Sequence, residues 1–266
     1  TAGINWLSDR TDAELAQLRG WRGAAAPSAG PGPASGFSLG QLGGGRTLPE
    51  EFMNWTALPA AKQIFDQGHC GSCWAVTTSK VLTLHQEIYR PESPRTFSAQ
   101  EILSCVPNPH KCGGSGGCNG ATSELALDWA MHYGIAQEDE VPYTAFNNVT
   151  GACPRSSAGY GALVQLGEHG FSIKPGVRRA PAGAPGLDFG LCAWERLLEN
   201  GYEALLRAIS ERGPVAGAIA ADPIRPYVHG VFDSCPRDAI INHNVVLLGY
   251  GKDRDSGALF WDIQNS

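Results

Sequence analysis

The chain has 266 residues, of which 42% are hydrophobic, and this is enough apolar material for the core of one large domain or two small ones. Lys and Arg number 20 against 26 Asp and Glu, so the formal net charge is -6. This balance argues against a nucleic-acid partner, because nucleic-acid-binding proteins carry basic patches. No apolar run approaches the roughly 20 residues that span a bilayer, so we expect no membrane insertion.

Glycine and proline are abundant, with 34 and 18 residues, which favours many turns over a helical bundle. Residues 23–45 are rich in Gly, Ala, Pro and Ser and predict a flexible linker that proteases can reach. From Leu48 onward the composition becomes that of a globular domain. Residues 158–190 again contain many Gly, Ala and Pro with little periodicity, and we interpret them as an inserted loop.

Helix signals dominate the first part of the globular region. The segment from Trp74 to Tyr89 lacks Gly and Pro, and its apolar residues suit a largely buried helix. Ser98 and Glu101 have the spacing of a capping box and open a short helix through Leu103. Further helices are predicted at 123–133 and 202–210, and strands at 215–220, 243–250 and 259–263. Because helices come first and strands last, the sequence predicts the α+β class with two segregated lobes.

The eight cysteines are too few for a small disulfide scaffold and too many for an ordinary cytosolic enzyme. If one of them is a nucleophile, seven remain, and an odd number cannot all pair within the chain.

The most informative stretch is residues 67–75, which read Gln-Gly-His-Cys-Gly-Ser-Cys-Trp-Ala. Cys73 stands where the predicted helix begins, and the positive end of a helix dipole favours a thiolate, which is the nucleophilic form of cysteine. Gln67 lies six residues earlier, and its side-chain amide and the Cys73 backbone N–H can both donate to a developing oxyanion. This pattern predicts nucleophilic catalysis by Cys73.

Two other interpretations of Cys-Gly-Ser-Cys are open, because a C-x-x-C pair also occurs in disulfide oxidoreductases and in zinc sites. A redox motif is expected near a βαβ pattern, and none is evident. A zinc site needs a second pair of ligands, and the spacing of Cys112 and Cys118 suits one poorly. We therefore expect neither a metal nor another cofactor.

Two further segments place polar residues at the ends of apolar strands. Residues 241–251 begin Ile-Asn-His-Asn and run into an apolar strand that ends Gly-Tyr-Gly. His243 stands at the polar start of this strand, where a lone histidine is usually structural. Asn265 follows shortly after the end of the apolar strand predicted at 259–263.

These motifs together resemble those of the papain-like cysteine peptidases, most closely the cathepsin L-like branch. The resemblance implies a two-lobed papain-like fold, with a helical left lobe, a β-barrel-like right lobe and the active-site cleft between them. It implies Cys73 as nucleophile, His243 as base, Asn265 as the residue that orients it and Gln67 as an oxyanion donor. The separation of Cys73 from His243 exceeds the roughly 130–150 residues typical of the family, which agrees with an insertion near residues 158–190.

The resemblance also extends to the substrate groove and the cysteines. Residues 116–121, Gly-Gly-Cys-Asn-Gly-Ala, resemble the family's glycine wall, where a substrate backbone pairs with a glycine. The substrate-binding residues it implies are Gly71, Ser72, Trp74, Gly120, Ala121 and Asn242. The disulfides it implies are Cys70–Cys118 and Cys105–Cys153. Cys235 normally pairs with a cysteine further along the chain, whereas Cys112 and Cys192 depart from the family pattern, so pairing with each other or with Cys235 stays open.

The N-terminal residues 3–9, Gly-Ile-Asn-Trp-Leu-Ser-Asp, resemble the G-x-N-x-F-x-D motif of the family's inhibitory propeptide, with Leu7 at the Phe position. We therefore expect residues 1–45 to be the C-terminal tail of a propeptide plus a Gly/Pro-rich linker. Residues 46–266 are expected to be a papain-like peptidase domain truncated at its C-terminus.

The predicted function is a cysteine endopeptidase, made as a zymogen, that hydrolyses peptide bonds through an acyl-enzyme. An endopeptidase is favoured because the paired histidines of the cathepsin B occluding loop are not evident. The alternatives are an inactive relative that acts as a binding or storage protein, and a C-x-x-C disulfide oxidoreductase. The expected partners are protein or peptide substrates and the protein's own propeptide, with the chain a monomer in a lysosome or vacuole or outside the cell.

Overall fold

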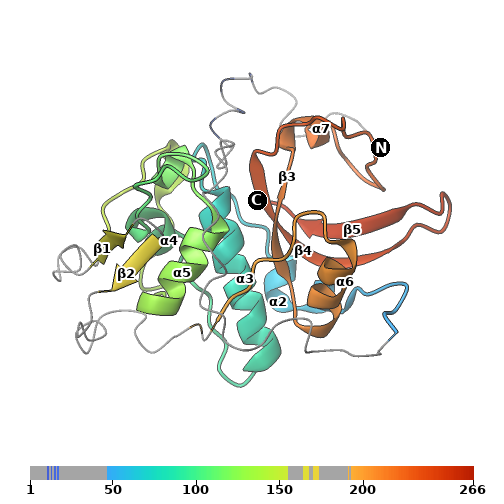
Figure 1. Ribbon diagram of the computed structural model, residues 1–266, viewed down its shortest axis with the longest axis horizontal. Helices are drawn as coiled ribbons and strands as arrows, with labels where there is room; N and C mark the ends of the chain where they lie inside the picture. Colours follow the sequence, from blue (N-terminus) through green and yellow to red (C-terminus); the bar gives the residue numbers. More distant parts are fainter. Residues whose placement is uncertain are drawn as a thin grey trace.

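A helical part and a sheet part lie on either side of one central helix. The computed structural model describes residues 47–154, 164–167, 170–173, 191 and 193–266, together with Thr11, Ala13, Leu15 and Gln17. The central helix is α3 (Cys73–Tyr89), with α4 and α5 on one side and the sheet β3-β4-β5 on the other (Figure 1). This is an α+β arrangement of two lobes, as the resemblance implies. Among the described residues, no helix combines the length and the apolar character needed to cross a membrane.

The helical lobe is built from short elements packed on α3. They are α4 (Ala99–Cys105), η3 (Gly117–Asn119), α5 (Ser123–Tyr133) and η4 (Ala145–Asn147). Two other short elements, η2 (Asn54–Ala57) and α2 (Pro59–Lys62), pack instead with the sheet lobe around Val246 and Leu248. Its core contains the fully buried side chains of Trp74, Phe97, Ile102 and Ile135. The bounds of α3 and α5 agree with the sequence prediction to within one residue, because their apolar runs are uninterrupted and Gly134, at φ +68°, ends α5.

The helix starts differ in their capping. Ser98 Oγ accepts a hydrogen bond from the Glu101 N–H at 2.9 Å, as a capping residue does. The other half of the expected capping box is wrong, because Glu101 Oε2 accepts from the Ala136 N–H, while the Ser98 N–H donates to the Ala136 carbonyl. Thr122 caps α5 through its side chain, whereas the Ser72 side chain makes no capping bond to α3.

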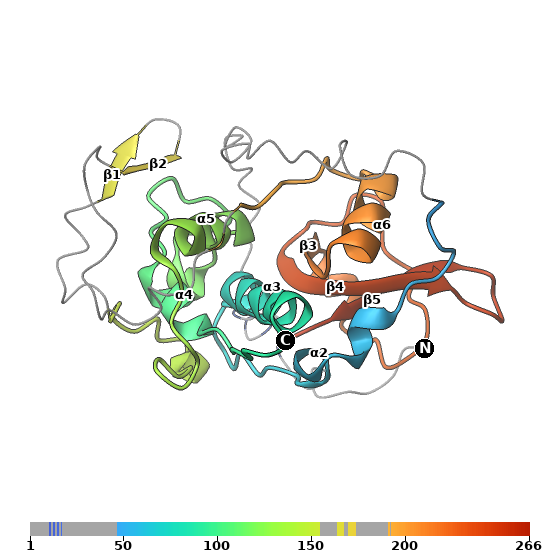
Figure 2. The same cartoon turned by 90° about the horizontal axis from the view of Figure 1, so that it is seen from below.

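The second lobe holds an antiparallel sheet in the order β3 (Val215–Ile219), β4 (His243–Lys252), β5 (Leu259–Gln264), at the positions predicted for strands. Ala218 pairs with Asn244, and Val246 pairs with Gln264. The helix α6 (Tyr202–Glu211) packs against this sheet through Ile209, which contacts the core around Leu247 (Figure 2). The short helix α7 (Ala221–Ile224) follows β3.

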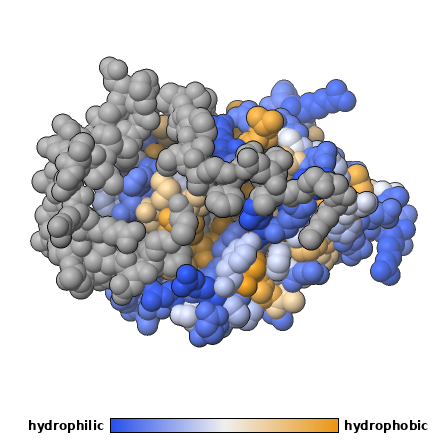
Figure 3. Space-filling model, turned by 60° about the horizontal axis from the view of Figure 1, so that its bottom comes forward, coloured by the Kyte–Doolittle hydropathy of each residue, from blue (hydrophilic) through white to orange (hydrophobic). Residues whose placement is uncertain are grey.

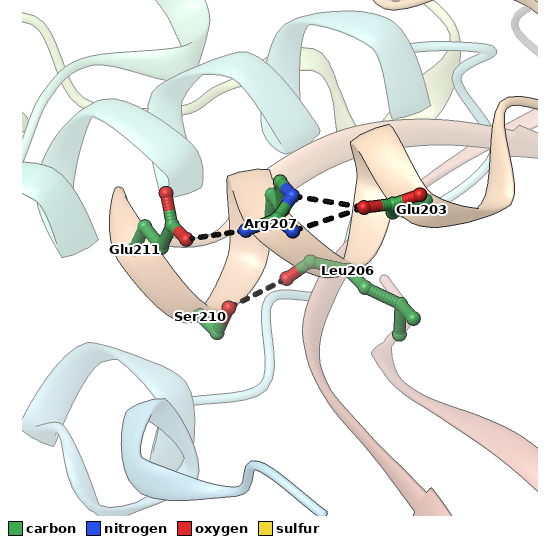
Figure 4. Close-up of polar contacts among 5 residues, drawn as sticks. All are labelled: Glu203, Leu206, Arg207, Ser210 and Glu211. Carbon is green, nitrogen blue, oxygen red and sulfur yellow. Dashed lines mark hydrogen bonds and ion pairs between the residues drawn. The ribbon is translucent and has the colours of Figure 1, made fainter. Parts of the chain in front are cut away.

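The outer face of α6 is polar. Arg207 lies between Glu203 and Glu211, with N···O distances of 2.9 and 3.1 Å (Figure 4). Ion pairs between residues four apart on a helix surface add little to stability, because water and salt screen them. On the face shown in Figure 3, hydrophobic residues form small patches among hydrophilic ones, as on an ordinary protein surface.

The region expected to be an inserted loop contains a hairpin. Residues Val164–Gly167 (β1) and Gly170–Ile173 (β2) pair as antiparallel strands, with Val164 opposite Ile173. The sequence interpretation missed these strands, because they are short and flanked by Gly, Ala and Pro. The linker at 23–45, the motif at 3–9, Cys192 and most of residues 158–190 lie outside the described residues.

Candidate active site

The first residue of α3 is Cys73, at the positive end of a 17-residue helix. The preceding loop approaches the helical lobe closely: the Gly71 N–H donates to the Cys118 carbonyl at 3.1 Å, and Cys70 forms a disulfide with Cys118. Gly68 has φ +61°, and a Cβ there would lie 2.6 Å from the backbone of Phe146. The chain therefore needs a glycine where this loop packs against η4.

The strand β4 brings His243 to Cys73. His243 is the first residue of β4 and pairs with Ile219 of β3, which fixes its backbone. The next residue, Asn244, donates its backbone N–H to Cys73 Sγ at 3.4 Å. The end of the sheet thus abuts the start of α3, and the His243 side chain hydrogen-bonds with that of Cys73.

Asn265 fixes the other side of the imidazole. Its Oδ1 lies 2.6 Å from His243 Nε2. A carbonyl oxygen only accepts hydrogen bonds, so Nε2 carries the proton and Nδ1 is left to face the sulfur of Cys73. The structure therefore brings together the three residues expected to form the catalytic set.

The electrostatics of this group favour a charged imidazole. Burial of the His243 ring is the largest single effect and lowers its pKa. The negative charge of Cys73 and the hydrogen bonds from Cys73 and Asn265 outweigh burial, so the pKa of His243 is raised from its ordinary value. Cys73 and His243 therefore titrate as a pair.

Gln67 lies at the beginning of the loop that leads to Cys73 and is 2% exposed. Its Nε2 donates to the Cys70 carbonyl at 2.8 Å, and its Oε1 accepts from Ser266 Oγ at 2.8 Å. Ser266 directly follows Asn265, so the end of the chain contacts this loop as well as the histidine. Nothing in the local sequence signals the role of Ser266, because its partner is 199 residues away.

The expected substrate-binding residues divide into two groups. Gly71 and Ser72 lie in the nucleophile loop, while Trp74 lies in α3 and donates its indole N–H to the Gly117 carbonyl at 3.2 Å. Gly120, at φ +91°, and Ala121 connect η3 to α5. Their neighbour Ser123 accepts from Asn244 Nδ2 at 3.3 Å, so the glycine wall and β4 meet beside Cys73.

Asn242, the last of the expected substrate-binding residues, belongs to neither group. Its Oδ1 accepts from the Ala221 N–H at 2.9 Å, and its Nδ2 donates to Asp222 at 3.1 Å. Its polar atoms therefore hold the start of α7.

The cysteine pairs settle two of the open alternatives. The structure contains the disulfides Cys70–Cys118 and Cys105–Cys153, the two that the resemblance implies. Cys70 therefore does not pair with Cys73, and the C-x-x-C redox interpretation loses its disulfide. Among the described cysteines, Cys112 and Cys235 are thiols, so they do not pair with each other, whereas a pairing with Cys192 lies outside the described residues and stays a prediction. Cys112 is buried in the helical lobe, whereas Cys235 is exposed beyond α7 in the other lobe.

A cavity in the sheet lobe is separate from this site, and the described part of the chain holds no candidate metal centre. Within the described residues, no cluster of three or more His, Cys, Asp and Glu side chains could hold a metal ion. A cavity of about 380 Å³ lies against α6 and the ends of β4 and β5, lined by Tyr250 and Trp261 among others. Cys73, His243 and Asn265 do not line it.

Comparisons with known proteins agree with this geometry. The model of the papain family cysteine proteases matches residues 48–180 and 188–266. The KDEL-tailed cysteine endopeptidase CEP2 of Arabidopsis thaliana is 30% identical over 218 residues, which cover 80% of this chain and 49% of that protein. The cathepsin L-like proteinase of Phaedon cochleariae is 24% identical over 99% of this chain and 68% of its own length. The chain thus spans about half the length of the first of these relatives.

The solved structures point the same way. The procathepsin B S9 of Trypanosoma congolense superposes with a TM-score of 0.67 at 25% identity, over 95% of this chain and 77% of that one. The digestive procathepsin L2 of the Tenebrio molitor larval midgut shares the fold with a TM-score of 0.73 at 23% identity, over 100% and 74% of the two chains. The chain therefore belongs to the papain family of cysteine proteases.

Proposed function

We propose that this chain is a cysteine endopeptidase that hydrolyses peptide bonds through an acyl-enzyme on Cys73. The observation that carries the proposal is the arrangement of Cys73, His243 and Asn265, with the His243 Nε2–Asn265 Oδ1 distance at 2.6 Å and a raised pKa at the histidine. The first of the relatives reported above is named as an endopeptidase, which supports the same activity.

The reaction begins with the thiolate–imidazolium pair. The Cys73 sulfur attacks the carbonyl carbon of the substrate and forms a C–S bond, while the carbonyl electron pair moves onto the oxygen. In this proposal the Cys73 N–H and Gln67 Nε2 donate to that oxyanion. The bond from Gln67 Nε2 to the Cys70 carbonyl holds this side chain beside the loop that leads to Cys73.

Collapse of the oxyanion breaks the C–N bond, and the leaving amine takes the proton from His243. The neutral imidazole then removes a proton from a water molecule, which attacks the thioester. The second collapse expels the Cys73 thiolate, releases the carboxylic acid and restores the imidazolium. Asn265 keeps the imidazole in one orientation through both stages.

The proposal includes regulation and location. Residues 1–45 would be the tail of an inhibitory propeptide and its linker, and the peptidase domain would begin near residue 46, with an insertion at 158–190. The similarity to several solved proforms supports this. The two disulfides favour an oxidising environment, so we place the protein in a lysosome or vacuole or outside the cell. Its partners would be peptide or protein substrates and its own propeptide.

A peptidyl epoxide labelling experiment tests the proposal. We expect the activated protein to hydrolyse unstructured peptides and to lose this activity when the epoxide alkylates Cys73, as located by mass spectrometry of the digested protein. Cys73→Ser should be neither labelled nor active, whereas Cys235→Ser, which removes an exposed thiol, should behave as the wild type. Labelling that disappears in Cys235→Ser and persists in Cys73→Ser would overturn the proposal.

A further inference from the structure

The phenol of Tyr143 connects the two ends of the loop that leads to Cys73. Its hydroxyl donates to the Gln67 backbone carbonyl at 2.9 Å and lies 2.6 Å from Ser72 Oγ. The phenol has a single hydrogen, which the Gln67 carbonyl takes, so the Ser72 hydroxyl donates to the phenol oxygen. The chain of hydrogen bonds therefore runs from Ser72 through Tyr143 to Gln67.

Tyr143 is itself held firmly. It is 7% exposed, and its ring packs edge-on against Phe65 and Phe146, with centroid distances of 5.0 Å in both cases. Its backbone N–H donates to Glu138 Oε1 at 2.8 Å. Burial, the largest effect, raises the pKa of the phenol to about 12, so the hydroxyl keeps its proton at any pH at which the protein operates.

The sequence position of Ser72 shows that this bond replaces another one. Ser72 directly precedes α3, where a serine side chain ordinarily accepts a hydrogen bond from the first turn of the helix. Here it makes no capping bond. Its hydroxyl instead donates to a residue that is 71 positions away. A fully buried serine that gives up the local bond for a distant partner indicates that the distant contact matters at this place.

We propose that Tyr143 is a positioning residue whose hydroxyl sets the separation of the two oxyanion donors. One proposed donor is the Gln67 side chain, at the start of the loop, and the other is the Cys73 N–H, at its end. Tyr143 holds the backbone of the first and the neighbour of the second. This inference rests on the proposed function, and it adds a part of the oxyanion site that no sequence motif indicated.

The test replaces Tyr143 by Phe, which keeps the ring and removes the hydroxyl. Without the link the loop can widen, and misplacement of a catalytic group by about 1 Å can cost on the order of 100-fold in rate. We expect kcat/KM for peptide hydrolysis to fall about 10- to 100-fold, mainly through kcat. Inhibition by a peptide aldehyde, which forms an oxyanion at Cys73, should weaken by a similar factor. Alkylation of Cys73 by iodoacetamide, which forms no oxyanion, should keep its rate.

Two controls sharpen the test. Tyr89→Phe removes another phenol that donates to a backbone carbonyl, that of Arg212, at the opposite end of α3, and should leave all three rates unchanged. Ser72→Ala should reproduce the loss, and the double variant Ser72→Ala with Tyr143→Phe should lose no more than about threefold beyond Tyr143→Phe alone, because both act through one chain of bonds. Multiplied losses in the double variant overturn the proposal.

A second measurement reports on the loop itself and is read together with the kinetics. In hydrogen-exchange mass spectrometry of the full chain, peptides that contain residues 67–72 should exchange faster in Tyr143→Phe than in the wild type. Unchanged exchange, or faster exchange with unchanged kcat/KM, refutes the positioning role. Failure of the wild type itself to hydrolyse peptides or to react at Cys73 refutes the proposed function instead.

Discussion

Ser266 Oγ donates to Gln67 Oε1 across 2.8 Å, although the two residues are 199 positions apart in the sequence. This bond orients the Gln67 amide, because an amide whose oxygen is held directs its nitrogen to the opposite side. The same segment carries Asn265, so one stretch of backbone after β5 contacts both His243 and the loop that leads to Cys73.

Ser266→Ala should therefore weaken catalysis without removing any reacting group. A hydrogen bond of this type contributes about 1 kcal/mol, or about fivefold in rate. We expect kcat/KM to fall by about that factor, measured with a fluorogenic peptide. Ser210→Ala, which removes a hydroxyl bond to the Leu206 carbonyl on α6 (Figure 4), should leave kcat/KM unchanged. An unaltered rate in Ser266→Ala would show that the Gln67 amide needs no such support.

Asn265→Ala should change the pH dependence of the reaction as well as its rate. The Asn265 hydrogen bond raises the pKa of His243, so its loss lowers that pKa. The thiolate–imidazolium pair then loses its proton at a lower pH, and the alkaline limb of the kcat/KM profile moves toward acid. We expect kcat to fall about 100-fold, as for other misoriented catalytic groups. As a control, Asn147→Ala at an exposed position should leave the rate and the pH profile unchanged. An alkaline limb that does not move in Asn265→Ala contradicts the assigned hydrogen bond.

The partly buried imidazole of His85 should make the stability of the fold depend on pH. Burial, the largest effect, lowers its pKa, while its hydrogen bond to the Pro214 carbonyl at 2.9 Å partly opposes this. Between the lowered pKa and the unfolded value of about 6.5, the unfolded chain binds more protons, so stability from this group is present above pH 6.5 and lost below it.

The urea concentration at the unfolding midpoint of the wild type should therefore decrease as the pH is lowered from 7 to 5. His85→Gln keeps a donor for Pro214 but cannot be protonated, so its midpoint should fall less over the same range. His110→Gln, at an exposed histidine, should follow the wild type. Equal slopes for His85→Gln and the wild type would rule out His85 as the source.

The two disulfides form a matched pair. Each joins cysteines separated by 48 residues, so each should stabilise the fold by a similar amount, about 2–4 kcal/mol. Only Cys70–Cys118 adjoins the loop before Cys73. Replacement of either pair by serine should lower the guanidinium midpoint similarly, whereas kcat/KM below the transition should fall only for the Cys70–Cys118 variant. A comparable loss of activity in the Cys105–Cys153 variant would mean that general destabilisation explains both.

The parts of the site that were predicted from sequence lie in short motifs whose local structure is strongly constrained. The cysteine at a helix start is visible within residues 67–75 and the histidine at the start of an apolar strand within residues 241–251, and the structure brings Cys73 and His243 together. The helices α3 and α5 could also be predicted from the sequence, because their apolar patterns are long and residues typical of helix ends flank them.

The parts that were missed depend on distant partners. Tyr143 reads as an ordinary loop tyrosine until the fold places it between Gln67 and Ser72. Glu101 has the spacing of a capping residue, but a buried N–H of Ala136 competes for its carboxylate. The side chain of Asn242 hydrogen-bonds to Ala221 and Asp222 of α7, and no sequence pattern near Asn242 predicts these contacts.

The absence of a side-chain cap on α3 carries a cost in local stability. A serine cap contributes about 1 kcal/mol to a helix, and α4 and α5 both have a side-chain cap while α3 does not. The helix that begins with Cys73 is thus less well anchored at its start than its two neighbours. The Ser72 hydroxyl bonds to Tyr143, 71 positions away, so local helix stability is given up for a long-range contact beside Cys73.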